Sequence, residues 1–213
     1  MEYLLPDGTL RVQTQAAHVR ALSFDLVPES ARTGVAARLV ELVEAAGMHL
    51  DTGFLSTPLL LPALAEAGHV ETAYALLLQD TEPSWLTMID RGATTMWERW
   101  NGIDADGVPH ESLNHYSKGA VISFLHRYVA GLEPTSPGYR TFRIRPLVGG
   151  GLTSASCSLD GPYGRIEISW RLDDRTFHLD VSVPGGSTAE LVLPDGNSAE
   201  VGPGSHSRDA RLS

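Results

Sequence analysis

The spacing of apolar residues changes near residue 132, and this change constrains the fold more than any other feature of the sequence. Before that point apolar residues recur every three to four positions, as in amphipathic helices. Beyond it they alternate with polar residues among glycines, prolines and serines. We therefore expect a helical domain over residues 1–133 and a β-sandwich domain over residues 134–213, joined through the turn-rich segment 133–138.

The first domain is predicted to contain about five helices. Ser30 is a candidate N-cap for the second helix, and Thr57 followed by Pro58 is a candidate start for the third. Residues 80–116 form a long connection before the last helix. The predicted helices cover residues 13–27, 30–47, 57–68, 69–79 and 118–130.

The second domain is predicted to be an antiparallel sandwich of short strands. Within 165–172 the polar and apolar residues alternate strictly, which is the period of a half-buried strand. Tight turns are expected at Asp173–Asp174 and at 194–196. The predicted strands cover residues 140–145, 152–159, 165–172, 176–183 and 188–193.

Charge and composition exclude several classes of partner. The net charge of -10 argues against binding to nucleic acid or to an anionic membrane surface, since both need basic residues. Cys157 is the single cysteine, so neither an internal disulfide nor a cysteine-based zinc site can form. The sequence contains no apolar run of about 20 residues and no signal-peptide pattern, so we assign it to the cytoplasm or to no particular compartment.

No metal or cofactor is expected from the motifs. His110-Glu111 does not continue into HExxH, the pattern of zinc proteases. Asp104, Asp106 and Gly107 resemble part of a calcium loop, but no glutamate follows at the required position.

The long connection at 80–116 has the composition of a sugar-binding site. It holds three of the four tryptophans, whose flat apolar faces suit the C–H face of a sugar ring. In the run from Trp97 to Trp100, the carboxylate of Glu98 lies between two tryptophans and is a candidate general base for activating water. The alternative is that Glu98 pairs with Arg99 or another base at the surface and that the tryptophans belong to the core.

His115 lies between Asn114 and Tyr116, just before the last predicted helix. It is a candidate for holding a sugar hydroxyl or orienting the base. The alternative is that Asn114 or Ser117 caps the helix and that His115 makes a structural hydrogen bond.

Three motifs resemble those of the bacterial α-L-rhamnosidases of glycoside hydrolase family 78. They are TGFLSTPLLLPAL, PSWLTMIDRGATTMWERW and SLNHYSKGAVISFLHRYVAGL. The later segments YRTFRIRP and VPGGSTAELVLPDG resemble the family's C-terminal β-sandwich. The resemblance implies the end of an (α/α)6 barrel followed by that sandwich, and hydrolysis of terminal α-L-rhamnosides with inversion.

The resemblance also assigns roles to particular residues. Glu98 would be the general base, and His115 would line the sugar pocket. Trp97 and Trp100 would form or support the pocket wall, and Thr57 would lie on a loop near it.

The family's general acid belongs to an upstream acidic motif that this sequence does not contain. We therefore expect little activity from the chain alone, and association either with the missing part of the enzyme or with itself. The alternative function is that of a non-catalytic carbohydrate-binding or scaffold protein derived from such an enzyme.

Overall fold

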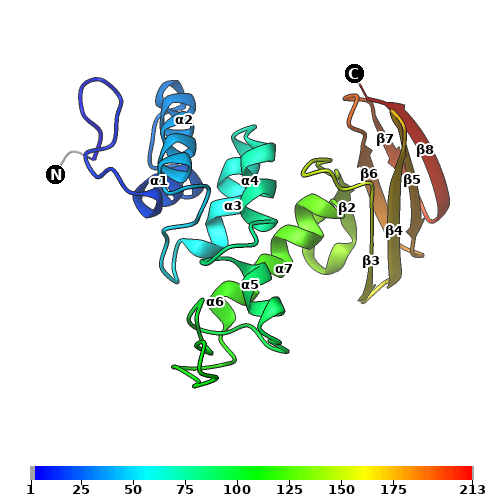
Figure 1. Cartoon of the computed structure of the whole chain (residues 1–213). Coiled ribbons are helices and arrows are strands. Elements are labelled where there is room, and N and C mark those ends of the chain that lie inside the picture. The colour runs from blue at the N-terminus through cyan, green and yellow to red at the C-terminus, as the bar shows by residue number, and fades with distance from the viewer. Residues whose placement is uncertain (1–2, 213) are drawn as a thin grey trace. The chain divides into compact units, whose positions relative to one another are not determined.

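A computed structural model describes residues 3–212, and the chain divides into two compact units, Met1–Val121 and Ile122–Ser213. Helices come first and strands follow, as the spacing of apolar residues predicts (Figure 1). The first unit contains α1 (Gln15–Ser23), α2 (Glu29–Ala45), α3 (Thr57–Glu66), α4 (Val70–Leu77), α5 (Trp85–Asp90) and α6 (Tyr116–Gly119). α7 (Val121–Phe124) leads into one π-helical turn, η1 (Leu125–Val129).

The helices of the first unit pack through the apolar stripes that the sequence shows. α1 packs against α2 and α3, and α3 packs against α4. On α2, Val35, Leu39 and Val43 are buried, one helical turn apart. No helix within residues 3–212 has both the length and the apolar character needed to cross a bilayer.

The predicted N-caps of two helices are wrong, by two residues for α2 and by one for α3. α2 begins at Glu29 rather than after Ser30, because Pro28 takes the N-cap position and no side chain caps the helix. α3 begins at Thr57 itself, and Ser56 takes the N-cap position. The hydroxyl of Thr57 instead donates to the carbonyl oxygens of Thr52 and Gly53, which folds the preceding loop back onto the helix.

The structure adds a short helix, α5, inside the predicted connection. The Ser84 hydroxyl caps it by accepting a hydrogen bond from the Thr87 backbone N–H at 3.2 Å.

A buried glutamine fixes another part of the same unit. The Gln15 side chain donates to the carbonyl oxygen of His49 and accepts from the N–H of Asp51, so α1 anchors the start of the 51–57 loop.

The second unit is a sandwich of two four-stranded sheets. One sheet has the order β1 (Leu132–Pro134), β2 (Thr141–Ile144), β6 (Thr188–Val192), β7 (Ser198–Val201). The other has the order β3 (Ser154–Gly161), β4 (Gly164–Asp173), β5 (Thr176–Val183), β8 (Gly204–Arg211). The predicted antiparallel sandwich is confirmed, with one exception: β2 pairs with β6 in parallel, and the other five pairings are antiparallel. The chain crosses to the other sheet between these two strands and returns in the same direction.

The alternation in β4 places its apolar side chains in the sandwich core. Ile166, Ile168 and Trp170 are buried, while Arg165 and Glu167 are exposed. The Trp170 indole packs against Phe177 at a centroid distance of 5.7 Å and donates its N–H to the carbonyl oxygen of Val129 at 2.7 Å. The predicted turns at 173–174 and 194–196 join β4 to β5 and β6 to β7.

Gly131, just after η1, can be tested as a position where the fold requires glycine. Its φ is +89°, and a Cβ atom there would lie 2.4 Å from the backbone nitrogen of Pro146. We expect Gly131→Ala to lower the free energy of unfolding by at least about 2 kcal/mol, from strain and backbone collision together. Gly185→Ala is the control, because nothing lies within 4 Å of a Cβ at that position. Urea titrations followed by circular dichroism measure both, and equal midpoints would contradict the account.

Candidate active site

Two segments that are distant in sequence run side by side in the first unit. The backbone N–H of His115 donates to the carbonyl oxygen of Met96 at 2.8 Å, and that of Glu98 donates to the carbonyl oxygen of Ser112 at 2.8 Å. The hydroxyl of Thr95 donates to the carbonyl oxygen of Leu113. This pairing brings the chain around Glu98 and the chain around His115 into one neighbourhood.

The residues between these segments form a compact loop closed by Asp104. Its carboxylate accepts from the backbone N–H groups of Asp106 at 3.0 Å and Val108 at 2.9 Å, and it lies 2.8 Å from His110 Nε2. The hydrogen bond with His110, followed by those from the backbone, lowers the pKa of Asp104. Asp104 thus orders the loop. No group of three or more histidine, cysteine or acidic side chains that could hold a metal ion occurs within residues 3–212.

Glu98 lies in a concave region that we call the Glu98 hollow. Its volume of about 570 Å³ is within the range of small-molecule sites. The Glu98 side chain is partly buried, and Oε2 accepts a hydrogen bond from the Ser112 N–H at 3.2 Å. The Arg99 guanidinium lies 3.9 Å from the carboxylate of Glu111. The ion pair that the structure gives Arg99 is therefore with Glu111 and not, as in the alternative, with Glu98. The hollow is lined by Thr52, Gly53, Phe54, Thr57, Glu82, Pro83, Glu98, Arg99, Trp100, Asn101 and Lys118.

His115 itself caps α6, so the alternative is wrong in naming Asn114 or Ser117 as the cap, but its other part, a structural hydrogen bond by His115, is confirmed. Its Nδ1 accepts the Ser117 backbone N–H at 3.2 Å. Because Nδ1 is the acceptor, the neutral imidazole carries its proton on Nε2, which is then a donor. The ring lies against Tyr116 at 4.9 Å and against Phe54, a residue of the Glu98 hollow, at 4.7 Å between centroids.

The other predicted site residues take different positions. Trp100 lines the Glu98 hollow and meets Trp85 edge-to-face at 5.3 Å. Trp97 is only 2 % exposed and is not among the lining residues, which is a supporting position in the core. A Cβ on Gly102 would lie 2.8 Å from the Cβ of Trp97, so the loop needs glycine there to pass the indole. Thr57 lines the hollow at 4 % exposure, with its hydroxyl in the hydrogen bonds described above.

Lys118 belongs to the site, and the sequence reasoning missed it. Only 5 % of its surface is exposed, and its ammonium group donates to the carbonyl oxygen of Glu98. The ammonium nitrogen lies 4.7 Å from the centre of the Trp100 ring and 5.6 Å from that of Phe54. Desolvation lowers the pKa of Lys118, and the Glu98 charge acts in the opposite direction. The available signal was composition, because Lys118 is the single lysine of a chain with fifteen arginines.

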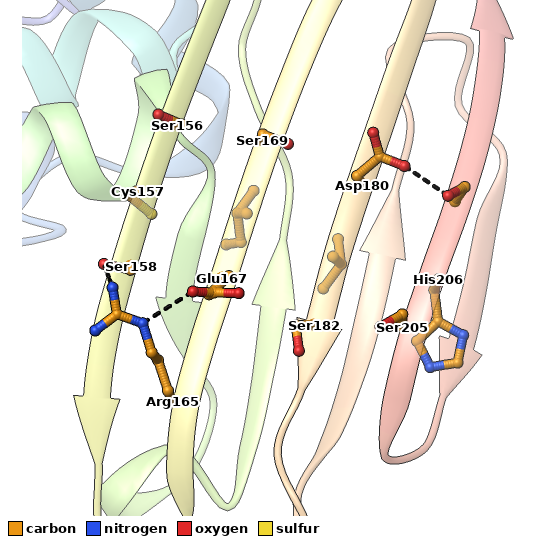
Figure 2. Close-up of a pocket in the computed structure, with 13 residues that line it drawn as sticks. Ser156, Cys157, Ser158, Arg165, Glu167, Ser169, Asp180, Ser182, Ser205 and His206 are labelled. Atoms are coloured by element: carbon orange, nitrogen blue, oxygen red, sulfur yellow. Dashed lines mark hydrogen bonds and ion pairs between the residues drawn. The ribbon is translucent and has the colours of Figure 1, made fainter.

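A second concave surface, on the sheet β3–β4–β5–β8, has a different chemistry. Serines and charged residues line it, without a tryptophan or tyrosine among them (Figure 2). Its charged groups already have partners: Arg165 contacts Glu167 at 2.9 Å, and the Ser207 hydroxyl donates to Asp180. Cys157, also on this sheet, is partly buried against the sandwich core, and burial raises the pKa of its thiol. This surface therefore lacks the tryptophan and phenylalanine rings found in the Glu98 hollow, and its two carboxylates are bound by Arg165 and Ser207.

The chain thus combines a helical unit, which carries an aromatic and carboxylate-bearing hollow, with a following β-sandwich. The model of the bacterial alpha-L-rhamnosidase six-hairpin glycosidase domain matches residues 1–129, and that of the bacterial alpha-L-rhamnosidase C-terminal domain matches residues 131–208. The chain belongs to the bacterial alpha-L-rhamnosidase family.

Curated relatives and solved structures agree with this assignment. The chain is 45 % identical to an alpha-L-rhamnosidase of Streptomyces avermitilis over 90 % of its own length and 19 % of the relative's. It is 41 % identical to one from Formosa agariphila, over 87 % and 20 %. The chain thus spans about a fifth of the length of these relatives.

Two solved structures match nearly all of the chain. The Streptomyces avermitilis alpha-L-rhamnosidase complexed with L-rhamnose matches with a TM-score of 0.92 and 41 % identity, covering 98 % of this chain and 22 % of that one. The native enzyme from Aspergillus terreus matches with a TM-score of 0.93 and 35 % identity, covering 98 % and 25 %.

The environment of Lys118 can be measured directly, because ¹³C-lysine labelling gives one side-chain signal. We expect its pKa to lie below the ordinary 10.5, and to fall further in Glu98→Gln, which removes the attraction of the carboxylate. Glu111→Gln is the control and should leave the pKa unchanged. Because folding lowers this pKa, the free energy of unfolding rises with pH between the folded and unfolded pKa values. Below the folded pKa the lysine is charged in both states, and the destabilisation has its full value. A titration identical to that of free lysine would contradict the described burial.

Proposed function

We propose that this chain supplies the general base of an inverting glycosidase acting on terminal α-L-rhamnosides. The base is Glu98, which takes a proton from the water that attacks the anomeric carbon. The observation that carries this proposal is the anchored carboxylate in a hollow walled by Trp100 and Phe54. The likeness to a rhamnosidase complexed with L-rhamnose supports rhamnose as the sugar.

Hydrogen-bond donors and an aromatic ring near Glu98 support the same role. The Ser112 N–H holds one carboxylate oxygen and thereby limits the rotation of the side chain. His115 does not itself line the hollow, but its ring lies against Phe54, which does, and its Nε2–H is a donor of the kind that binds a sugar hydroxyl. Trp100 offers an apolar ring surface suited to sugar C–H groups.

Inverting hydrolysis requires a second carboxyl group as general acid, roughly 6.5–9.5 Å from the base. Glu82 lines the hollow as well, but Arg91 binds its carboxylate at 2.7 Å, which suits a structural role. The relatives are longer than this chain, which matches only one segment of them. We infer that the acid comes from the part of the enzyme outside that segment. The same inference predicts little or no turnover by the 213 residues alone.

A chimera tests the assignment of the base. In it this chain replaces the matching segment of the Streptomyces avermitilis enzyme, so that the relative supplies the remaining residues. We expect the chimera to hydrolyse nitrophenyl α-L-rhamnoside, and Glu98→Gln to lower kcat by at least about 100-fold, because glutamine cannot accept the proton. Glutamine keeps an oxygen for the Ser112 N–H, so the loss would report basicity rather than geometry.

The control is Glu111→Gln, which neutralises a nearby exposed carboxylate and should leave kcat unchanged. Full turnover in the Glu98→Gln chimera would reject Glu98 as the base. A well-folded parent chimera that binds L-rhamnose in calorimetry without hydrolysing the glycoside would favour the carbohydrate-binding alternative instead.

A further inference from the structure

Lys118 makes contacts to two different parts of the proposed site at once. Its ammonium group donates to the backbone carbonyl of Glu98, and it lies over the ring of Trp100. Its own backbone carbonyl accepts the indole N–H of Trp85 at 3.0 Å, and Trp85 meets Trp100 edge-to-face. One residue therefore connects the segment of the base, a wall ring and the helix α5.

The placement of a charged group here is costly unless its partners are well oriented. Burial at 5 % exposure removes the ammonium from most of its water. A main-chain oxygen and two aromatic faces replace that water, and the Glu98 charge lies near enough to raise the lysine pKa against desolvation. These partners belong to two segments, the run from Trp97 to Trp100 and the 51–57 loop, so the cation is satisfied only when both segments hold this arrangement.

We propose that Lys118 is a positioning residue of the active site, whose cation fixes the main chain of Glu98 and the ring of Trp100 in their working geometry. The proposal rests on the proposed function, since it acts through Glu98. Lys118 takes no part in proton transfer, and its effect falls on the orientation of the base. Loss of the cation therefore lowers kcat more than it raises KM.

The order of three variants in the chimera tests this proposal. Lys118→Met keeps the length and apolar stem but removes the charge, and should lower kcat roughly 100-fold, the effect of a misplaced catalytic group. Lys118→Arg keeps a cation with N–H donors that stacks on aromatic rings, and should retain more activity than methionine. Arg20→Met on α1 removes one exposed positive charge and should match the parent.

Packing alone predicts the reverse order, because methionine fits an apolar site better than arginine does. Methionine outperforming arginine, or methionine equal to the parent, would overturn the proposal. If Lys118→Met does not fold, judged by its thermal melt, Lys118→Gln replaces it with the same expected order. Full turnover in Glu98→Gln rejects the proposed function, whereas an inactive Glu98→Gln beside an unimpaired Lys118→Met rejects only the role of Lys118.

Discussion

The site depends on the backbone pairing between residues 96–98 and 112–115. Two N–H···O bonds of 2.8 Å align the segments, and the N–H of Ser112 then reaches the Glu98 carboxylate. Such bonds persist only where the residues between the segments fold compactly, and Asp104 closes that loop through its own backbone and histidine contacts. A carboxylate held by main-chain geometry loses little orientational freedom when a sugar binds, which is what a general base requires.

The patterned elements of the fold were predictable, and those stabilised by tertiary contacts were not. The stripe of Val35, Leu39 and Val43 and the alternation around Trp170 each bury one face, so the sequence alone reveals them. β8 was not predicted, because Ala210 is its one buried residue among serine, arginine and aspartate, so the strand has no alternation of apolar and polar residues. α5 has six residues, which is too few for a periodic apolar stripe. The parallel pair β2–β6 depends on a crossover between sheets that no local pattern records.

Residue type indicated a carboxylate and aromatic rings near one another, but not which rings line the hollow and which are buried beneath it. The run from Trp97 to Trp100 suggests two equivalent tryptophans, yet the loop turns at Gly102 so that Trp97 is buried and Trp100 lines the hollow. His115 combines two tasks, since capping α6 through Nδ1 also selects the tautomer with Nε2–H. Lys118 was missed because a lysine on a helix is ordinarily solvated, and its burial depends on Phe54 and Trp100 from other segments.

A crystal structure of the chimera with bound L-rhamnose would test the central claim most directly. The account predicts the sugar in the Glu98 hollow, against Trp100, with a water molecule about 3 Å from the Glu98 carboxylate and facing the anomeric carbon. Rhamnose bound elsewhere, or a Glu98 side chain that faces away from the anomeric carbon while the 96–98 and 112–115 segments remain paired, would contradict it.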